Sequence, residues 1–345
     1  MRRVTGVRGR YLLIFVVFDP AAARYARPST FGPAKHLSVS RPTLGVMVKL
    51  RKAPSEPDLS SRGAGSSEQG SALGAGPAKQ ASLPLYGLSE LRAAKAAFWQ
   101  ALRVEFGRAG GTQAPDMLDF SRSTVPTRIE AEVLFTQVCG YPLQKLFASQ
   151  AIVLGAPLYE AEFCEGATHC GVFVVGREAS YEGLKDLRDC RFAFGGPFSN
   201  SGMNLPRRAI AEIAGGSPFF ARAIENDSQA GNLEQVAHGQ ADATCVDNVT
   251  LAYVVRHRPK VAAELRVLAP TPRSPTIPFV TSSATPSANV KRLRRALAEV
   301  AAAPEWTNAR AGLMLSGIVP AEAADYECLL EYERQAITLG YSQLR

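Results

Sequence analysis

The stretch that decides the fold is Arg-Phe-Ala-Phe-Gly-Gly-Pro-Phe-Ser-Asn-Ser-Gly-Met-Asn, residues 191–204. Its first four residues, Arg191–Phe194, are typical of a short buried strand, and the glycines and proline that follow end it. A helix is predicted from about Asn204 to Ala214, where apolar residues return at helical spacing. A strand that passes through a glycine-rich turn into a helix is a building unit of α/β domains.

The same alternation of strands and helices continues on both sides of this unit, with at least two further helices expected after Pro304. It predicts α/β lobes with mainly parallel sheets and right-handed crossovers. The predicted strands are 81–86, 150–156, 171–175, 219–225, 243–247, 265–268 and 279–282, and the predicted helices are 89–106, 128–135, 142–149, 181–187, 228–238, 249–256 and 290–302.

The length of 345 residues suits two lobes rather than one small domain. The net charge of +8 is unevenly distributed, because residues 1–80 hold 13 Lys and Arg against 4 Asp and Glu. The rest of the chain holds 26 basic and 27 acidic residues and is close to neutral. A nucleic-acid partner is therefore not expected, since phosphate binding needs clustered Lys and Arg on the folded part.

Residues 1–80 form a separate basic segment, which we expect to be a disordered tail or a signal peptide followed by a linker. Arg2–Arg10 is basic, Tyr11–Phe18 is apolar, and small residues follow, which is the pattern of a secretory signal peptide. The alternative is an upstream start codon, with Met47 as a possible true start. A membrane association is expected only through such a signal or through a membrane-bound partner.

Ser199, Asn200 and Ser201 stand where the predicted helix begins. Unpaired N–H groups and partial positive charge gather at a helix start, so these residues can bind an oxyanion without Lys or Arg. The alternative is that a serine only caps the helix. Asp247 ends a predicted strand, where ligands of α/β sheets bind, although it can equally cap the helix over 249–256.

Enzyme machinery is sparse in the sequence. No Gly-x-Ser-x-Gly, His-Glu-x-x-His, Cys-x-x-Cys or P-loop pattern occurs, and no metal or cofactor is expected. Tyr141 follows a predicted strand end and is a candidate donor, or part of an ordinary turn. Among the six cysteines, Cys139 and Cys164 are the pair we favour for a disulfide, with buried free thiols as the alternative.

The chain from about Ala81 to Ala302 resembles the phosphate/phosphite/phosphonate-binding proteins, the solute receptors of ABC importers. The resemblance rests on six runs in the same order, namely Ala-Ser-Leu-Pro-Leu-Tyr (81–86), Thr-Gln-Val-Cys-Gly-Tyr-Pro-Leu (136–143), Cys-Glu-Gly (164–166), Ser-Asn-Ser-Gly-Met-Asn (199–204), Ala-Asp-Ala-Thr-Cys-Val-Asp (241–247) and Pro-Thr-Ile-Pro-Phe-Val-Thr (275–281).

This resemblance implies a type II periplasmic-binding-protein fold, in which two lobes joined by two crossing strands close around a ligand. Lobe one would comprise 81–175 and 279–345, and lobe two 176–278, with crossings near Val174–Glu178 and Pro270–Pro278. The implied function is a periplasmic substrate-binding protein that binds a small oxyanion (phosphonate, phosphate or phosphite) between the lobes and delivers it to a permease.

Carried over by motif, the resemblance makes Ser199, Asn200 and Ser201 the anion cradle and Asp247 the strand-end carboxylate. Tyr141 and Tyr86 would be tyrosines of the cleft. The sequence departs from the family at Gln229, where a histidine is common, so the ligand-binding set we expect is Tyr86, Tyr141, Ser199, Asn200, Ser201, Gln229 and Asp247.

Two other functions stay open. An enzyme on the same scaffold, acting on a small phosphorylated or pyrimidine substrate, would need Cys139 or Cys245 as its reactive group. A ligand-sensing module would act through a signalling partner.

Overall fold

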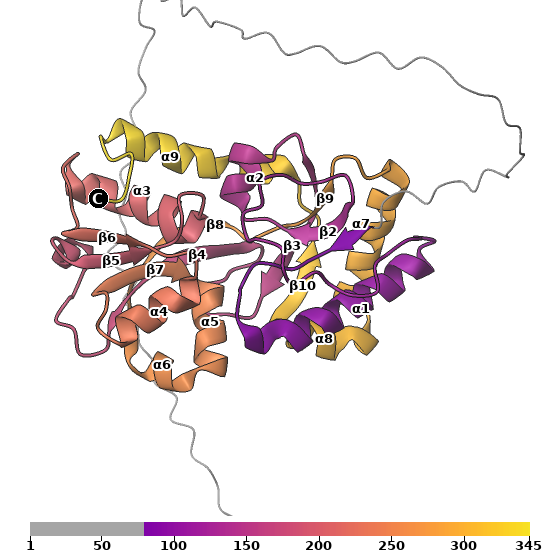
Figure 1. Cartoon of the computed structure of the whole chain (residues 1–345), viewed down its shortest axis with the longest axis horizontal. Coiled ribbons are helices and arrows are strands. Elements are labelled where there is room, and N and C mark those ends of the chain that lie inside the picture. The colour runs from indigo at the N-terminus through magenta and orange to yellow at the C-terminus, as the bar shows by residue number, and fades with distance from the viewer. Residues whose placement is uncertain (1–78) are drawn as a thin grey trace, which may run out of the picture. The chain divides into compact units, whose positions relative to one another are not determined.

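The computed structural model describes residues 79–345, which contain two five-stranded sheets (Figure 1). The predicted tail and signal peptide lie outside the described residues. The first sheet has the order β1-β2-β9-β3-β10, with β1 (Gln80–Ala81), β2 (Val133–Gln137), β3 (Ala151–Tyr159), β9 (Phe279–Ser282) and β10 (Leu315–Val319). The second has the order β6-β5-β7-β4-β8, with β4 (Thr168–Gly176), β5 (Arg191–Phe194), β6 (Arg222–Glu225), β7 (Ala243–Asp247) and β8 (Leu265–Pro275).

Helices accompany each sheet, and we call each sheet with its helices a lobe (Figure 1). Lobe one carries α1 (Arg92–Arg108), α2 (Gly140–Leu146), α7 (Ser287–Ala302) and α8 (Thr307–Ala311). Lobe two carries α3 (Leu205–Ala214), α4 (Gln229–Ala237), α5 (Asn248–His257) and α6 (Pro259–Ala263). The last helix, α9 (Cys328–Thr338), contacts both α3 and α2 and so reaches across both lobes.

The sheets are mixed, whereas the sequence predicted mainly parallel ones. Parallel pairing occurs between β1 and β2, β5 and β6, and β5 and β7, and the remaining pairs are antiparallel. The reason is the crossing of the chain between the lobes. Strand β9 enters lobe one from lobe two and inserts antiparallel between β2 and β3.

The chain crosses between the sheets at 160–167, after β3, and at 276–278, after β8. The second crossing falls within the predicted Pro270–Pro278. The first lies before β4 rather than near Val174–Glu178, because β4 pairs with β7 and β8 along its length. At the second crossing, the Thr276 N–H donates to Ala167 O (2.9 Å), which ties the two crossings together.

Two other differences concern strands β2 and β10. The predicted helix 128–135 is replaced by β2, all five residues of which are buried. An apolar run with no exposed face carries no periodicity that separates helix from strand. Strand β10, which pairs antiparallel with β3, was predicted as part of a helical tail.

Stacked aromatic rings fill the core of each lobe. In lobe one, Phe135 stacks on Trp99 (5.7 Å between ring centroids) and on Phe279 (5.3 Å), which joins α1 to the middle of the sheet. In lobe two, Phe192 stacks on Phe220 at 4.3 Å. Such pairs contribute about 0.5–1.5 kcal/mol each beyond the burial of their apolar area.

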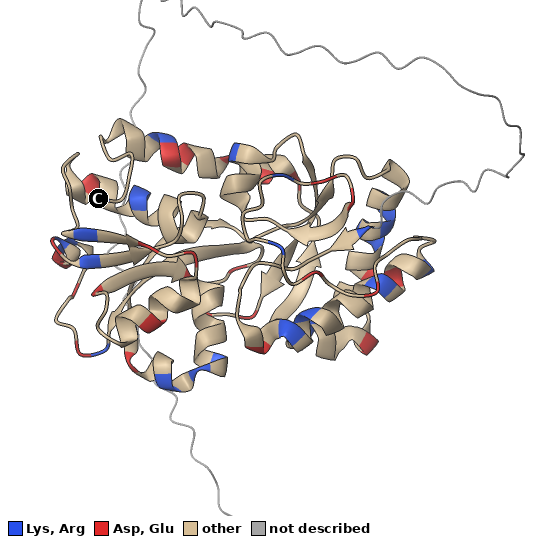
Figure 2. Cartoon of the chain, in the orientation of Figure 1, with Lys and Arg blue, Asp and Glu red and all other residues tan. Residues whose placement is uncertain are grey.

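Charged residues of both signs are interspersed on the helices, as Figure 2 shows for α1 and α9. Within the described part of the chain, no helix is long and apolar enough to cross a membrane.

Candidate functional site

The turn after β5 is shaped by glycines. A Cβ on Gly202 would lie 2.8 Å from Ser199 Oγ and 3.0 Å from the Gly195 nitrogen, so only glycine allows this close approach. Ser199 Oγ accepts a hydrogen bond from the Gly202 N–H (3.0 Å) and thereby caps a single π-helical turn, Asn200–Asn204, that leads into α3. Ser199 therefore has the capping role that the sequence left open, and its hydroxyl oxygen also lies within reach of a second donor.

That second donor is Gln229, the first residue of α4. Its Nε2 lies 3.1 Å from Ser201 Oγ and 3.4 Å from Ser199 Oγ, and donates to both. Its Oε1 accepts a hydrogen bond from the Asp247 N–H at 2.7 Å. The structure thus brings four of the predicted site residues into one hydrogen-bonded group, which we call the Gln229 network (Ser199, Ser201, Gln229, Asp247). The network uses both ends of the Gln229 amide, so a histidine at this position could not make the same three contacts.

Asp247 stands at the end of β7, with about 1% of its surface exposed. Its Oδ1 accepts from the Val249 N–H (2.9 Å) and caps α5, the role offered as the alternative from sequence. Its Oδ2 lies 2.8 Å from Nδ1 of His169, which is equally buried on β4. His169 is not among the site residues predicted from the sequence, and no signal in the linear sequence connects it with Asp247.

Asn200 is buried in the turn and points back into lobe two. Its Nδ2 donates to Ser274 Oγ on β8 (3.0 Å), and its Oδ1 accepts from Asn204 Nδ2 (3.2 Å). In this structure it anchors the turn to the sheet, while its neighbours Ser199 and Ser201 contact Gln229.

Tyr86 belongs to lobe one and packs among tyrosines of both lobes. Its backbone is left-handed (φ +55°), and the buried Lys95 ammonium donates to the carbonyls of Leu85 (2.7 Å) and Tyr86 (2.9 Å). The ring packs edge-on against Tyr159 (5.8 Å) and Tyr253 (5.5 Å), and its buried hydroxyl has no hydrogen-bond partner among the described residues. Burial, and secondarily the Asp247 charge, raises the pKa of Tyr86, so its phenol is a neutral donor.

Tyr141 lies apart from the Gln229 network, in the contact between α2 and α9. Lys145 Nζ is 5.9 Å from the centre of its ring, and Glu333 of α9 pairs with Lys145 at 2.6 Å. Burial raises the pKa of Tyr141, with the Glu333 carboxylate acting in the same direction. In this conformation its surroundings make it a part of the α2–α9 packing.

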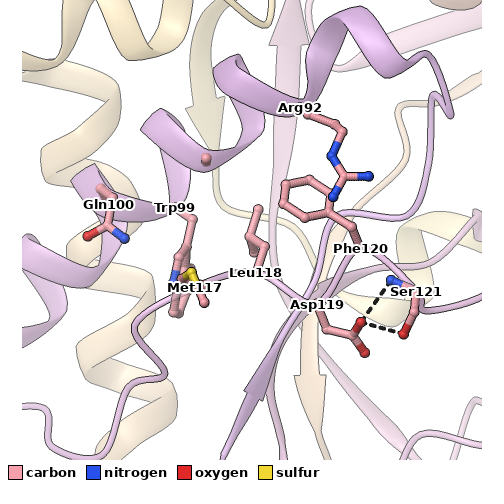
Figure 3. A pocket seen from close by; sticks show the side chains of 9 residues that line it. Arg92, Trp99, Gln100, Met117, Leu118, Asp119, Phe120 and Ser121 are labelled. Carbon is pink, nitrogen blue, oxygen red and sulfur yellow. Dashed lines mark hydrogen bonds between the residues drawn. The ribbon is translucent and has the colours of Figure 1, made fainter.

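A small cavity lies between side chains of lobe one and Tyr253 of α5. This cavity of about 10 Å³, lined by Tyr86, Gln137, Tyr159 and Tyr253 among others, has room for roughly one water molecule. No residue of the Gln229 network lines this cavity. A larger groove of about 570 Å³ lies elsewhere, between α1 and residues 117–121, where Arg92 covers the Phe120 ring (Figure 3). It contains none of the predicted site residues.

Helix α5 joins lobe two to lobe one by three hydrogen-bonded contacts near its end. Tyr253 OH donates to Leu313 O (2.8 Å), and Arg256 donates to Ala311 O (3.1 Å). Arg258 pairs with Glu90 through both carboxylate oxygens, at 2.7 and 3.0 Å. These contacts join the two lobes in this structure.

The cysteines do not support the disulfide or the enzyme prediction. All six are free, so the predicted Cys139–Cys164 bond is absent. Burial raises the pKa of Cys139 to about 11 and that of Cys245 well above its ordinary value. A nucleophilic cysteine needs a thiolate, which these environments disfavour. Among residues 79–345, no cluster of three or more His, Cys, Asp or Glu could hold a metal ion.

Comparison with known proteins covers most of the body of the chain. The profile of a family described as ABC transporter, phosphonate, periplasmic substrate-binding protein matches residues 146–326, slightly more than half of the 345 residues. The matched range contains the whole Gln229 network and His169. No curated protein sequence shows a significant match.

Solved structures show the same fold at low sequence identity. A binding protein component of an ABC phosphonate transporter from Pseudomonas aeruginosa has a TM-score of 0.60 at 15% identity, covering 76% of this chain and 87% of that one. A Xanthomonas citri protein bound to ATP has a TM-score of 0.55 at 16% identity, covering 76% and 97%.

A Prochlorococcus marinus protein in complex with methylphosphonate has a TM-score of 0.50 at 16% identity, covering 69% of this chain and 82% of that one. These likenesses confirm the type II periplasmic-binding-protein fold.

Proposed function

Because the chain belongs to the family of periplasmic substrate-binding proteins of phosphonate ABC transporters, we propose that it binds a small oxyanion between its two lobes. It is a solute-binding protein rather than an enzyme. We expect a phosphonate, phosphate or phosphite as the ligand, a permease of the importer as the partner, and the periplasm as the location.

The observation that carries this proposal is the Gln229 network within the family-matched range. Three segments far apart in the sequence, the turn after β5, the start of α4 and the end of β7, meet through hydrogen bonds of 2.7–3.4 Å. Each segment ends at a helix N-terminus with N–H groups that have no partner within the helix. Neutral donors and helix dipoles of this kind favour an anion.

Asp247 limits which anions the site accepts. A fully ionised ligand beside a buried carboxylate meets a like charge, while a ligand that carries a proton can donate it in a hydrogen bond. The neutral phenol of Tyr86, whose hydroxyl is buried and unpartnered, is a further donor that an oxyanion could use. We therefore expect selection by many neutral hydrogen bonds rather than by Lys or Arg.

Isothermal titration calorimetry of the full chain with phosphate, phosphite, methylphosphonate and sulfate tests the proposal. We expect one-to-one binding of at least one of these anions without formation of a product. Gln229→Ala should weaken it by about 1–3 kcal/mol, because it removes the amide donor that holds the Ser199 and Ser201 hydroxyls in place.

Small-angle scattering provides a second readout. We expect the radius of gyration to differ between the ligand-free and saturated protein, with bending at the crossings 160–167 and 276–278. Absence of binding to all four anions would contradict the proposed function.

A further inference from the structure

A buried arginine lies in the first turn of α3, directly after residues 199–204, which we call the Ser199 turn. Arg207 is 4% exposed, and its guanidinium makes two hydrogen bonds. Its Nη2 donates to Asn204 Oδ1 at 2.7 Å, and its Nη1 donates to the Ser342 carbonyl at 3.0 Å. Among residues 79–345, no other Lys or Arg side chain is hydrogen-bonded to the Ser199 turn. Arg207 thus connects the end of this turn to the C-terminal segment.

Asn204 connects Arg207 to the rest of the Ser199 turn. It is fully buried, and its Nδ2 donates to Asn200 Oδ1 (3.2 Å) and to Leu329 O of α9 (3.0 Å). Helix α9 lies alongside α3 (Figure 1). The Asn204 backbone N–H donates to Ser199 O at 3.0 Å. Without Arg207, Asn204 Oδ1 would be a buried acceptor that has lost its donor, which is costly, so the amide would have to rearrange.

The charge of Arg207 is only loosely compensated. Its Nη2 lies 3.8 Å from Glu333 Oε1, whereas Lys145 Nζ lies within 2.6–2.8 Å of both oxygens of that carboxylate. The Nε of Arg207 is buried and has no hydrogen-bond partner among the described residues. A buried charge without a close counter-charge is costly, and an apolar side chain would fill this place at lower cost. The hydrogen bond to Asn204 is therefore the contact that distinguishes an arginine here.

We propose that Arg207 is a positioning residue of the oxyanion site. This rests on the proposed function, that of an oxyanion receptor. Through Asn204, Arg207 holds the Ser199 turn in the geometry in which Ser199 and Ser201 both accept from the Gln229 amide. Without it the turn samples other geometries, and a ligand binds only the fraction of molecules in which the turn is correctly ordered. Arg207 thus acts on affinity without touching the ligand.

Calorimetry on the full chain compares Arg207→Met with a matched control, Arg208→Met. Arg208 is the next residue of α3, and its Nε donates to Gln335 Oε1 of α9 at 2.6 Å. Within the described part of the chain it has no hydrogen bond to the Ser199 turn. Each variant loses a tie between α3 and the C-terminal part of the chain, so both should unfold at lower urea concentration.

The probes are phosphate, phosphite, methylphosphonate and sulfate. We expect Arg207→Met to bind the preferred anion roughly 5- to 100-fold more weakly than the wild type, because this variant leaves Asn204 Oδ1 buried without a donor. Arg208→Met should bind like the wild type. Equal affinities of the two methionine variants would overturn the role of Arg207 and leave the receptor function intact. Failure of the wild type to bind any of the four anions would overturn both.

A double-mutant cycle with Ser201→Ala separates positioning from a general loss of stability. Because Arg207 acts through the turn that carries Ser201, Arg207→Met should cost less affinity in the Ser201→Ala background than in the wild type. Losses of affinity that simply add would overturn the proposal.

Arg207→Lys covers the case in which Arg207→Met does not fold. Lysine keeps the positive charge, but one ammonium group cannot bridge Asn204 and Ser342 as the planar guanidinium does. We expect Arg207→Lys to bind the preferred anion more weakly than Arg208→Lys, and more tightly than Arg207→Met where that variant folds. Equal affinities of the two lysine variants would overturn the proposal.

Discussion

Tyr253→Phe removes one hydroxyl from the contact between the lobes. In this structure the hydroxyl donates to Leu313 O at 2.8 Å, and the side chain is fully buried. Phenylalanine keeps the ring and its edge contact with Tyr86, so the aromatic packing is preserved. The change therefore acts mainly on the hydrogen bond that spans the two lobes.

The magnitude follows from what happens to the Leu313 carbonyl. In the closed variant it is buried without its donor, which costs about 1–3 kcal/mol, whereas in an open form water can take the place of the tyrosine. The equilibrium between closed and open lobes should shift by roughly 5- to 150-fold toward the open form. A ligand that binds the closed form should lose affinity by up to the same factor.

Small-angle scattering of the ligand-free protein and calorimetry with the preferred anion measure the two effects. Tyr341→Phe is the matched control. Tyr341 OH also donates to a carbonyl at 2.8 Å, but this is the carbonyl of Arg345, only four residues further along the chain, so the bond does not span the lobes. The control should lower the free energy of unfolding and leave ligand affinity unchanged. If Tyr253→Phe behaved like Tyr341→Phe, the assignment of α5 as the closing contact would be refuted.

Three further predictions concern the turn, the surface ion pair and a buried lysine. Ser201→Ala should weaken anion binding by about 1–3 kcal/mol and leave the free energy of unfolding nearly unchanged. Ser199→Ala should weaken binding and also lower the free energy of unfolding by about 1 kcal/mol, because Ser199 caps the turn. Equal free energies of unfolding for the two variants in urea would argue against a capping role for Ser199 alone. Hydrogen bonding to Arg258 lowers the pKa of Glu90 from 4.5 to about 2, so the pair stabilises the closed protein fully above pH 4.5 and less as the pH falls toward 2. Scattering should show opening near pH 3, and Glu90→Gln should open to a similar extent at neutral pH. Burial lowers the pKa of Lys95 from 10.5 to about 8. Between pH 8 and pH 10.5 the unfolded chain therefore binds more protons than the folded one, and the free energy of unfolding should rise with pH. In chemical denaturation experiments, Lys95→Met should abolish this rise.

Short strands bounded by turn residues were predictable along the chain. The bounds of β5, β7 and β9 agree with the sequence analysis, because each is a compact apolar run that starts or stops at Gly, Pro, Asp or Ser. Strand β2 was wrongly predicted as a helix over 128–135, because its side chains are buried on both faces and no polar alternation marks them.

Some residues of the candidate site were also predictable from local sequence, and others were not. Ser199, Ser201 and Asp247 stand at helix starts, a local feature with a local signal in the sequence. Gln229 was singled out only as a departure from the family, and its bridging role depends on the placement of α4 beside the turn.

Local order in this protein follows from its linear pattern, since strand length, turn residues and helix caps depend on neighbours a few positions apart. That order was enough to indicate an α/β chain with oxygen-bearing side chains at helix starts. The pairing of His169 with Asp247 and the seating of Tyr141 against α9 arise from contacts between residues far apart in sequence. Such contacts form only when strands that are far apart in the sequence pair within one sheet and the lobes pack together. Hydrophobic burial and strand pairing, rather than local propensity, bring those residues into contact.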